Sequence, residues 1–348
     1  MRDIRKFLLE YDGPPVNIME VCGTHTASVA HNGIPSLLSP KIRLISGPGC
    51  PVCVTVTDYI DRLIELALTP GTIVATFGDM LRVTGSKQSL KDARSDGAMV
   101  KMLYAPSDII PLAAAEPEKT FVFAAVGFET TTAVYAALLD DLVTSGVTNV
   151  KLLTSLKVMP PVIEWVCGEE GGIDGFLAPG HVSVITGSNL FVPIAKEYKI
   201  PFAVAGFEGE QILMALYALV KMIRAGDSRV VNLYPEAVTA EGNRTAQEMI
   251  AKYFEPCDAA WRGIGIVKDS GMQLKDEYKN FDAGSRDLCS DVTLHPECRC
   301  GRVITGAMKP VGCPLFGKKC TPENPMGACM VSSEGSCHSY YVNRRNDL

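Results

Sequence analysis

The stretch KIRLISGPGCPVCVTVTDYIDRLIELAL, residues 41–68, joins a predicted strand to a predicted helix and carries a Cys-x-x-Cys pair at the junction. The apolar run at 41–45 is typical of a short β-strand. Apolar residues recur three and four positions apart over 57–68 and predict an amphipathic helix, with Asp58 as a candidate N-cap. A strand that leads directly into a helix indicates an α/β fold.

Two glycines and two prolines between these elements predict a tight turn that carries Cys50 and Cys53. We expect both thiols on exposed backbone close to the helix start, where the helix dipole favours thiolate. Such a pair in an α/β protein indicates redox or metal chemistry. The alternative is a pair of small residues buried in a turn.

Composition narrows the classes of function. Of 348 residues, 47% are hydrophobic and 21% are charged, and the net charge is -6. Without a long basic run, neither nucleic acid nor a membrane is an expected partner. No apolar run approaches the ~18 residues of a spanning helix, and the first residues lack a signal-peptide core. We therefore expect a soluble cytoplasmic protein, in which twelve cysteines indicate metal or thiol chemistry rather than a disulfide scaffold.

Strand-like runs alternate with helical patterns along most of the chain and predict an α/β fold with two parallel-sheet domains that face a cleft. We expect the first domain over residues 1–115 and the second over 116–228. Residues 229–348 are expected to form a mixed, loop-rich iron–sulfur domain. The echo of FAAVGFE (123–129) in FAVAGFE (202–208) predicts that these two strands belong to one sheet.

Polar residues follow several predicted strands, where the chemistry of parallel sheets gathers. Cys22 and His25 share the turn CGTHT, which suits a thiolate ligand or nucleophile beside a proton carrier. A buried structural cysteine and a capping histidine are the alternative. Glu129 in GFETTT either caps the following helix or lines the cleft. His181 in PGHVS follows a Pro-Gly turn at a predicted strand end and is a candidate for the same cleft.

Six cysteines between residues 298 and 337 lie in a segment with little apolar material for a core, so a metal centre could replace packing. They are Cys298, Cys300, Cys313, Cys320, Cys329 and Cys337. Only the first two are close in sequence, and the wide spacing of the others favours a four-thiolate iron–sulfur cluster over zinc. Zinc and a metal-free segment remain alternatives. Cys167, Cys257 and Cys289 are interpreted as packing residues.

Several long motifs together resemble the HypD family of hydrogenase maturation factors. They are CGTHT (22–26), SGPGCPVCVT (46–55), ATFGDMLRV (75–83), GFETTT (127–132), PGHVSVITG (179–187) and the cysteine-rich tail 296–341. The resemblance covers nearly the whole chain. Thr84 and Ala133 depart from it where proline is expected, which concerns loop shape rather than chemistry.

The resemblance implies a role in building the Fe(CN)2(CO) unit of [NiFe] hydrogenases, in complex with the small chaperone HypC. Cyanide would come from carbamoyl phosphate through HypF and HypE, and the hydrogenase large subunit would be an indirect partner. Cys22 would bind iron, His25 would assist it, and Cys50 and Cys53 would be a redox pair. The family spacing C-x14-C-x6-C-x16-C assigns a [4Fe-4S] cluster to Cys298, Cys313, Cys320 and Cys337.

Two other functions fit parts of the pattern. A free-standing, iron–sulfur-dependent disulfide reductase would use every one of these thiols except Cys22, so the CGTHT turn distinguishes it from an assembly factor. The second alternative is an interaction protein whose C-terminal segment is held together by zinc, and such a protein would be colourless. In either assembly or reductase chemistry, the Cys50/Cys53 pair would carry thiol redox activity.

Overall fold

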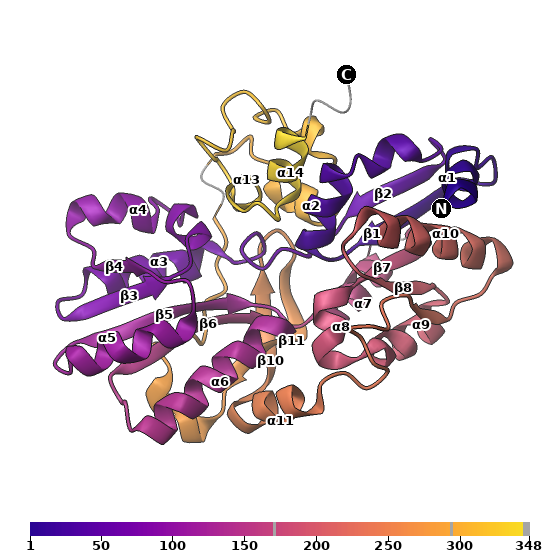
Figure 1. Ribbon diagram of the computed structural model, residues 1–348. Helices are drawn as coiled ribbons and strands as arrows, with labels where there is room; N and C mark the ends of the chain where they lie inside the picture. Colours follow the sequence, from indigo (N-terminus) through magenta and orange to yellow (C-terminus); the bar gives the residue numbers. More distant parts are fainter. Residues whose placement is uncertain (170–171, 293–294, 344–348) are drawn as a thin grey trace.

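The computed structural model describes residues 1–169, 172–292 and 295–343. Two β-sheets flanked by helices lie side by side, and the cysteine-rich C-terminal segment, gold in Figure 1, lies over their junction next to α2 (Gly23–His31). The predicted α/β class, with mostly parallel sheets and a loop-rich C-terminal region, is confirmed. Within the ranges just given, no helix is both long and apolar enough to cross a membrane.

The first sheet is parallel throughout and has the strand order β2-β1-β7-β8-β9. Its strands are β1 (Val16–Glu20), β2 (Ile42–Ser46), β7 (Gly175–Pro179), β8 (Phe202–Ala205) and β9 (Val230–Asn232). Helices α1 (Arg2–Leu9) and α10 (Gly209–Ala225) pack on one face through residues such as Ile18 and Leu177. The opposite face, with Phe176 and Phe202, packs on α7 (Met159–Glu169) and α9 (Val192–Tyr198).

The second sheet has the order β10-β11-β6-β5-β3-β4, parallel except at β10 and β11. Its strands are β3 (Thr72–Thr76), β4 (Val100–Met102), β5 (Thr120–Gly127), β6 (Val150–Lys157), β10 (Phe254–Trp261) and β11 (Gly265–Leu274). Helices α3 (Thr57–Leu68) and α4 (Leu90–Ala93) cover one face. Helices α5 (Ile109–Ala115), α6 (Glu129–Ser145) and α11 (Arg244–Tyr253) cover the other.

The remaining helices are short. In the C-terminal segment they are α12 (Cys300–Ile304), α13 (Ala328–Val331) and α14 (Ser336–Val342), and α8 (Gly180–Thr186) follows β7. The 3-10 turns are η1 (Ile34–Leu37), η2 (Asp79–Arg82), η3 (Arg94–Asp96), η4 (Pro106–Asp108), η5 (Ser188–Phe191), η6 (Asp276–Phe281) and η7 (Pro310–Gly312). Long loops therefore dominate the cysteine-rich segment, in keeping with its few apolar residues.

Neither sheet is built from one continuous part of the chain. The first combines residues 16–46 with 175–232, and the second combines 72–157 with 254–274. Strand β5, which contains most of FAAVGFE, lies in the second sheet, and β8 of FAVAGFE lies in the first, so the prediction that they share a sheet is wrong. Similar local sequence encodes a similar strand-to-turn geometry, but sheet membership depends on distant pairing. Each sheet takes strands from more than one of the three predicted ranges.

The unit around residues 41–68 folds as expected in most respects. Helix α3 spans Thr57–Leu68 and buries Ile60, Leu63 and Ile64, as the spacing predicts. Asp58 is not its N-cap, because α3 begins at Thr57 as predicted and Val56 therefore holds the N-cap position. The Asp58 carboxylate instead accepts a hydrogen bond from the backbone N–H of Ser290 at 2.6 Å.

Candidate functional site

Four motif-bearing turns follow the carboxyl ends of strands in the first sheet. CGTHT follows β1, GPGCPVC follows β2, the turn with His181 follows β7, and the turn with Phe207 follows β8. Since these strands are parallel neighbours, their carboxyl ends meet at one edge of the sheet. Glu129, by contrast, follows β5 of the second sheet.

Glu20, the last residue of β1, organises the CGTHT turn. Its buried carboxylate accepts hydrogen bonds from the backbone N–H of Cys22 at 3.1 Å and from the Thr26 hydroxyl. Burial raises the pKa of Glu20 to about 8, against the opposing effect of these hydrogen bonds. Sequence reasoning missed this residue, although a lone carboxylate in the apolar run VNIMEV was a usable signal.

Cys22 holds the N-cap position of α2 and is buried. Burial raises the pKa of its thiol to about 12, while the backbone N–H groups of His25 and Thr24 act in the opposite direction. The thiol therefore keeps its proton at neutral pH. A bound metal ion would displace that proton, since metals bind the thiolate.

Cys50 and Cys53 form a disulfide. Both residues are buried, with 5% and 2% of their surface exposed, so the predicted exposure is wrong. Their turn is covered because it packs in one apolar cluster with Val21, which precedes the CGTHT turn, and with Cys329 of α13. The N–H of Cys53 lies 3.2 Å from the sulfur of Cys50.

The two cysteine turns lie against each other. The N–H of Gly23 donates to the carbonyl of Gly49 at 2.8 Å, and the N–H of Gly47 donates to the carbonyl of Glu20 at 2.8 Å. A side chain at position 49 would place its Cβ 2.2 Å from the backbone nitrogen of Cys22. Glycine at this position therefore permits the close approach of the two backbones.

Two histidines of the site contact the ring of Phe207. The rings of His25 and His181 lie 4.7 and 4.0 Å from it between centroids. His25 is fully buried, its Nε2 lies 2.9 Å from the carbonyl oxygen of Gly206, and its Nδ1 has no hydrogen-bond partner among the described residues. Burial lowers the pKa of His25 to about 4, so the ring is neutral at pH 7 and Nε2–H donates to Gly206.

His181 is the more exposed of the pair, and burial lowers its pKa less strongly. Phe207, which sequence reasoning missed, joins His25 to His181. Phe207 lies in the sequence GFE at 206–208, which repeats the GFE at 127–129. In that repeated sequence only Glu129 was predicted as a site residue.

Glu129 does not cap its own helix. It is the first residue of α6, and its Oε1 accepts a hydrogen bond from the N–H of Met159, the first residue of α7, at 2.8 Å. Burial raises its pKa to about 7, and Oε2 has no partner among the described residues. No hydrogen bond within the described ranges joins Glu129 to the cysteine turns.

The C-terminal cysteines gather around one small pocket. Its lining includes Cys298, Cys300, Cys313, Cys320, Cys329 and Cys337. The N–H of Cys337 lies 3.1 Å from the sulfur of Cys329. A hydrogen bond to Cys300, together with burial, raises the pKa of Cys298. The four predicted cluster ligands and the other two cysteines, Cys300 and Cys329, line the same pocket. The choice of four ligands therefore stays a prediction.

The donor set of this pocket fits a metal cluster chemically, because soft thiolates are the ligands that iron–sulfur clusters and zinc prefer. In the described parts of the chain, no three Cys, His, Asp or Glu side chains converge as ligands of one metal ion. An iron–sulfur cluster spans more space than one ion, since each of its thiolates binds a different iron, so its ligands need not converge on a single point.

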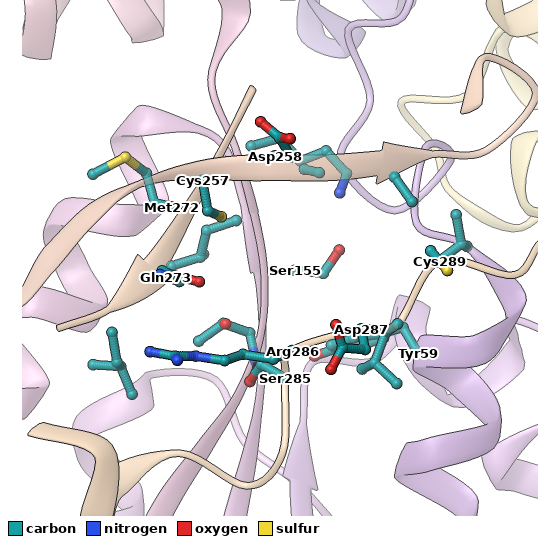
Figure 2. A pocket seen from close by; sticks show the side chains of 18 of the residues that line it. Tyr59, Ser155, Cys257, Asp258, Met272, Gln273, Ser285, Arg286, Asp287 and Cys289 are labelled. Atoms are coloured by element: carbon teal, nitrogen blue, oxygen red, sulfur yellow. Dashed lines mark hydrogen bonds between the residues drawn. The ribbon is translucent and has the colours of Figure 1, made fainter. Parts of the chain in front are cut away.

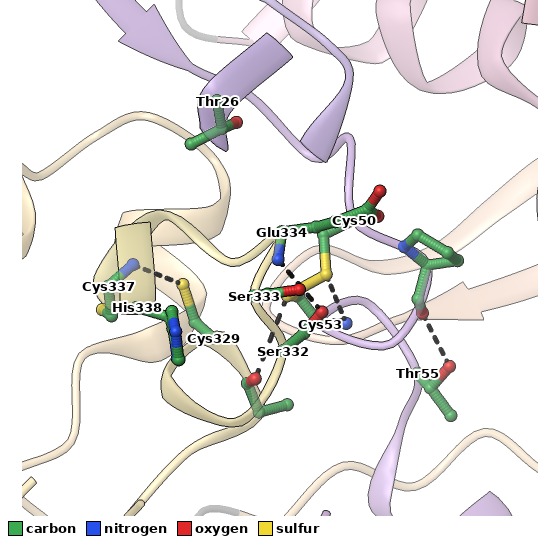
Figure 3. The surroundings of a disulfide bond; sticks show 12 residues. Thr26, Cys50, Cys53, Thr55, Cys329, Ser332, Ser333, Glu334, Cys337 and His338 are labelled. Atoms are coloured by element: carbon green, nitrogen blue, oxygen red, sulfur yellow. Dashed lines mark hydrogen bonds between the residues drawn. A yellow bond between two sulfur atoms is a disulfide. The ribbon is translucent and has the colours of Figure 1, made fainter. Parts of the chain in front are cut away.

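The cysteine pocket is held against both turns. The Thr24 hydroxyl donates to Glu334 Oε1 at 2.8 Å, and α14 packs on α2. The sulfur of Cys53 lies 3.9 Å from the carbonyl oxygen of Ala328, at the start of α13. Figure 3 shows the loop with Ser332, Ser333 and Glu334 between the disulfide and the pair Cys329 and Cys337. Three cysteine motifs far apart in sequence thus form one assembly.

Fold and site together define a two-sheet α/β protein in which two cysteine-bearing turns meet a cysteine-rich C-terminal segment. The protein-family model HypD, described as "Hydrogenase formation hypA family", matches residues 1–344. The hydrogenase maturation factor HypD of Escherichia coli is 40% identical over 339 residues, covering 96% of this chain and 90% of the relative.

Two further relatives agree. The hydrogenase expression/formation protein HupD of Azotobacter chroococcum is 40% identical over 335 residues, or 93% of this chain and 88% of the relative. The hydrogenase maturation factor HypD of Azotobacter vinelandii is 39% identical over 335 residues, with the same coverage. The chain belongs to the HypD family and is a hydrogenase maturation factor.

Proposed function

We propose that the protein is the scaffold and redox component on which the Fe(CN)2(CO) unit of a [NiFe] hydrogenase is assembled. The observation that carries this proposal is the contact between the CGTHT turn, the Cys50–Cys53 turn and the cysteine pocket. An iron-binding thiol, a two-electron thiol couple and a set of cluster ligands are brought together at the carboxyl edge of one sheet.

Cys22 is the residue that binds the iron of the cargo. Soft thiolates suit the low-spin iron that binds cyanide and CO. Because burial keeps the Cys22 thiol protonated, iron binding would release one proton. A second thiolate, from the partner HypC, would leave the other positions on iron for the diatomic ligands.

His25 and His181 are positioning residues in this proposal. Neutral His25 donates to the carbonyl oxygen of Gly206 and thereby ties the CGTHT turn to the end of β8. His181 stacks on Phe207, the residue after Gly206, and so supports the same turn at the end of β8. Glu129 anchors the start of α7, which packs beneath the first sheet.

Cys298, Cys313, Cys320 and Cys337 would hold a [4Fe-4S] cluster, which supplies single electrons when bound. Reduction of the Cys50–Cys53 disulfide takes two electrons and two protons and yields two thiols. Because the disulfide is buried, exchange with thiols in solution is hindered.

The partners follow from the same proposal. HypC would supply the second thiolate, HypE would deliver cyanide, and the hydrogenase large subunit would receive the finished unit indirectly. We place this work in the cytoplasm, where free cysteines outside a disulfide persist.

The test is anaerobic purification of the protein in complex with HypC, followed by infrared spectroscopy and by measurement of iron, sulfide and zinc. The wild type is expected to show CN and CO bands, which Cys22→Ala loses. Cys289→Ala, which removes an exposed cysteine, is the matched control and is expected to keep them. Full bands in Cys22→Ala would refute the ligand assignment, and zinc without sulfide would refute the cluster.

Burial of the disulfide weighs against the alternative of a free-standing disulfide reductase. Such an enzyme must let a sulfur of Cys50 or Cys53 reach the disulfide of another protein, and both are almost fully covered. Turnover of a disulfide substrate at the wild-type rate by Cys22→Ala would nevertheless favour the reductase.

A further inference from the structure

A second cavity, of about 480 Å³, lies in the second sheet, and none of the candidate residues described above lines it. It is bordered by β6, β10, β11 and the segment 282–289, and Figure 2 shows side chains from these elements around it. Its volume is typical of small-molecule sites. No cysteine of the two turns or of the C-terminal pocket lines it.

The cavity exists because β11 leaves β6 early. The two strands pair only at Gly271↔Lys157 and Met272↔Leu156. Nearer the start of β6 the segment 282–289 takes the place of β11. Ala283 N–H donates to Leu152 O at 2.9 Å, and Thr154 N–H donates to Ser285 Oγ at 2.8 Å. The space between these two sets of bonds is the cavity.

Lys157 is the unusual residue of this cavity. It is the last residue of β6, only 4% of its surface is exposed, and no hydrogen bond or ion pair to its amine occurs among the described residues. Its Nζ lies 5.6 Å from the ring centroid of Trp261, which is an attraction but does not replace an anionic partner. Burial lowers its pKa to about 8, with the neighbouring Cys257 acting in the opposite direction.

Among the described residues, no carboxylate around the cavity forms an ion pair with the Lys157 ammonium. Asp282 accepts hydrogen bonds from Ser285, and Asp258 accepts one from the N–H of Asp269 at 3.0 Å. Arg286 points its guanidinium to Asp276 at 2.8 Å, so it does not compete for an anion deep in the cavity. The other titratable or charged residues of the lining are Tyr59, Cys257, Lys279, Asp287 and Cys289.

Ser155 adds a second polar group on the same side. It lies two positions before Lys157, and residues two apart on a strand face the same way. Ser155 is buried, lines the cavity, and its hydroxyl makes no hydrogen bond in the described part of the structure. Neither atom is among the fully covered polar atoms that lack a partner, so both the ammonium and the hydroxyl are accessible from the cavity. A ligand oxyanion that enters the cavity can therefore meet two hydrogen-bond donors at once.

We propose that this cavity binds a small molecule carrying a carboxylate or phosphate group, with that group against the Lys157 ammonium and the Ser155 hydroxyl. An oxyanion accepts hydrogen bonds from both groups and neutralises the buried charge. The apolar side chains of Met272 and Leu288 contact the remainder of the ligand. This proposal does not depend on the assembly role of the cysteines.

The experiment is NMR spectroscopy of the full-length protein with isotope-labelled lysine side chains, titrated with inorganic phosphate and separately with acetate. The ε signal of Lys157 is identified by its absence in Lys157→Met, or in Lys157→Gln if the first variant does not fold. Sodium chloride at equal ionic strength separates binding from charge screening.

We expect a saturable shift of the Lys157 signal and a rise of its pKa with one anion, which identifies the phosphate or carboxylate class. Affinity for that anion is expected to fall about ten- to hundredfold in Lys157→Met. Lys268→Met, at an exposed site on β11, is the control and is expected to bind normally. A Lys157 signal that responds to neither anion beyond chloride, or equal affinity in Lys157→Met and Lys268→Met, would overturn the proposal.

Discussion

Glu129 carries a buried carboxylate with one satisfied and one unsatisfied oxygen, and its protonation should be visible in the stability of the protein. Its pKa is raised from 4.5 to about 7 by burial. Between these two values the unfolded chain has lost the proton that the folded chain retains. The free energy of unfolding contributed by this group therefore falls as pH rises from 4.5 to 7, by roughly 3 kcal/mol.

Glu129→Gln is expected to remove this loss, because the amide stays neutral at every pH in the window. The measurement is urea unfolding at pH 5 and at pH 8 for the wild type and the variant. Glu248→Gln, at an exposed position on α11, is the control and should keep the wild-type difference. Equal pH dependence in wild type and Glu129→Gln would contradict the assigned pKa.

Gly49 is the second residue for which a single substitution is informative. In Gly49→Ala the new Cβ would meet the backbone of Val21 and Cys22 at 2.4 and 2.2 Å, so one turn must move. We expect a loss of about 2–3 kcal/mol in the free energy of unfolding. Gly168→Ala, in an exposed part of α7 with open space around it, should instead gain about 0.5–1 kcal/mol. Similar unfolding midpoints for the two variants would show that the turns are not in tight contact.

Chemically distinctive residues of the site could be predicted from the sequence, and their supports could not. Cys22, Cys50 and Cys53 stand out because thiols in glycine-rich turns after strands are uncommon. Glu20 and Glu334 are ordinary acids until the fold buries one beneath Cys22 and brings the other to Thr24, 310 positions away in sequence. The predicted exposure of the Cys50 turn failed for the same reason, since its cover comes from a distant segment.

At the scale of elements, the contact between α2 and the loop before α14 fixes the C-terminal segment on the CGTHT turn. Thr24→Val removes the hydrogen bond to Glu334 and keeps the size of the side chain. We expect a loss of about 1–2 kcal/mol and faster amide hydrogen exchange over residues 332–342. Mass spectrometry of exchange measures this directly.

The control is Thr186→Val, which removes a hydroxyl bonded only within its own helix α8 and the glycine that follows it. Exchange over 332–342 should not change in this variant. If Thr24→Val also left that exchange unchanged, the loop would be held by packing alone and the Thr24–Glu334 bond would have no role in docking.

Elements with strong local periodicity were predictable, and those defined by pairing were not. Helix α3 begins and ends at the predicted residues because its apolar spacing and its flanking turns agree. Strand β10 alternates buried and exposed positions imperfectly and exists through its antiparallel partner β11, so its sequence did not predict it. Sheet membership, likewise, depends on contacts that no local pattern encodes.

At the scale of the whole molecule, each sheet needs distant parts of the chain. A fragment of residues 1–115 contains the pairs β1–β2 and β3–β4 but lacks β7 and β5, which pair with β1 and β3 on their other sides. We expect this fragment to be unfolded in isolation, because two separate two-stranded parallel pairs bury too little apolar surface. Its proton–nitrogen NMR spectrum should show little dispersion, whereas the full chain should give a dispersed one. A dispersed spectrum of the fragment would support residues 1–115 as an independent domain.

The shared edge of β1, β7 and β8 also has a consequence for how the protein is made. During synthesis on the ribosome, β1 and β2 emerge early but must wait for β7, β8 and β9 before their sheet closes. The CGTHT and GPGCPVC turns are therefore translated long before the strands that complete their sheet. Only when α14 has left the exit tunnel can it cover α2. Protection of the cysteines in these two turns is thus postponed until α14 has been translated.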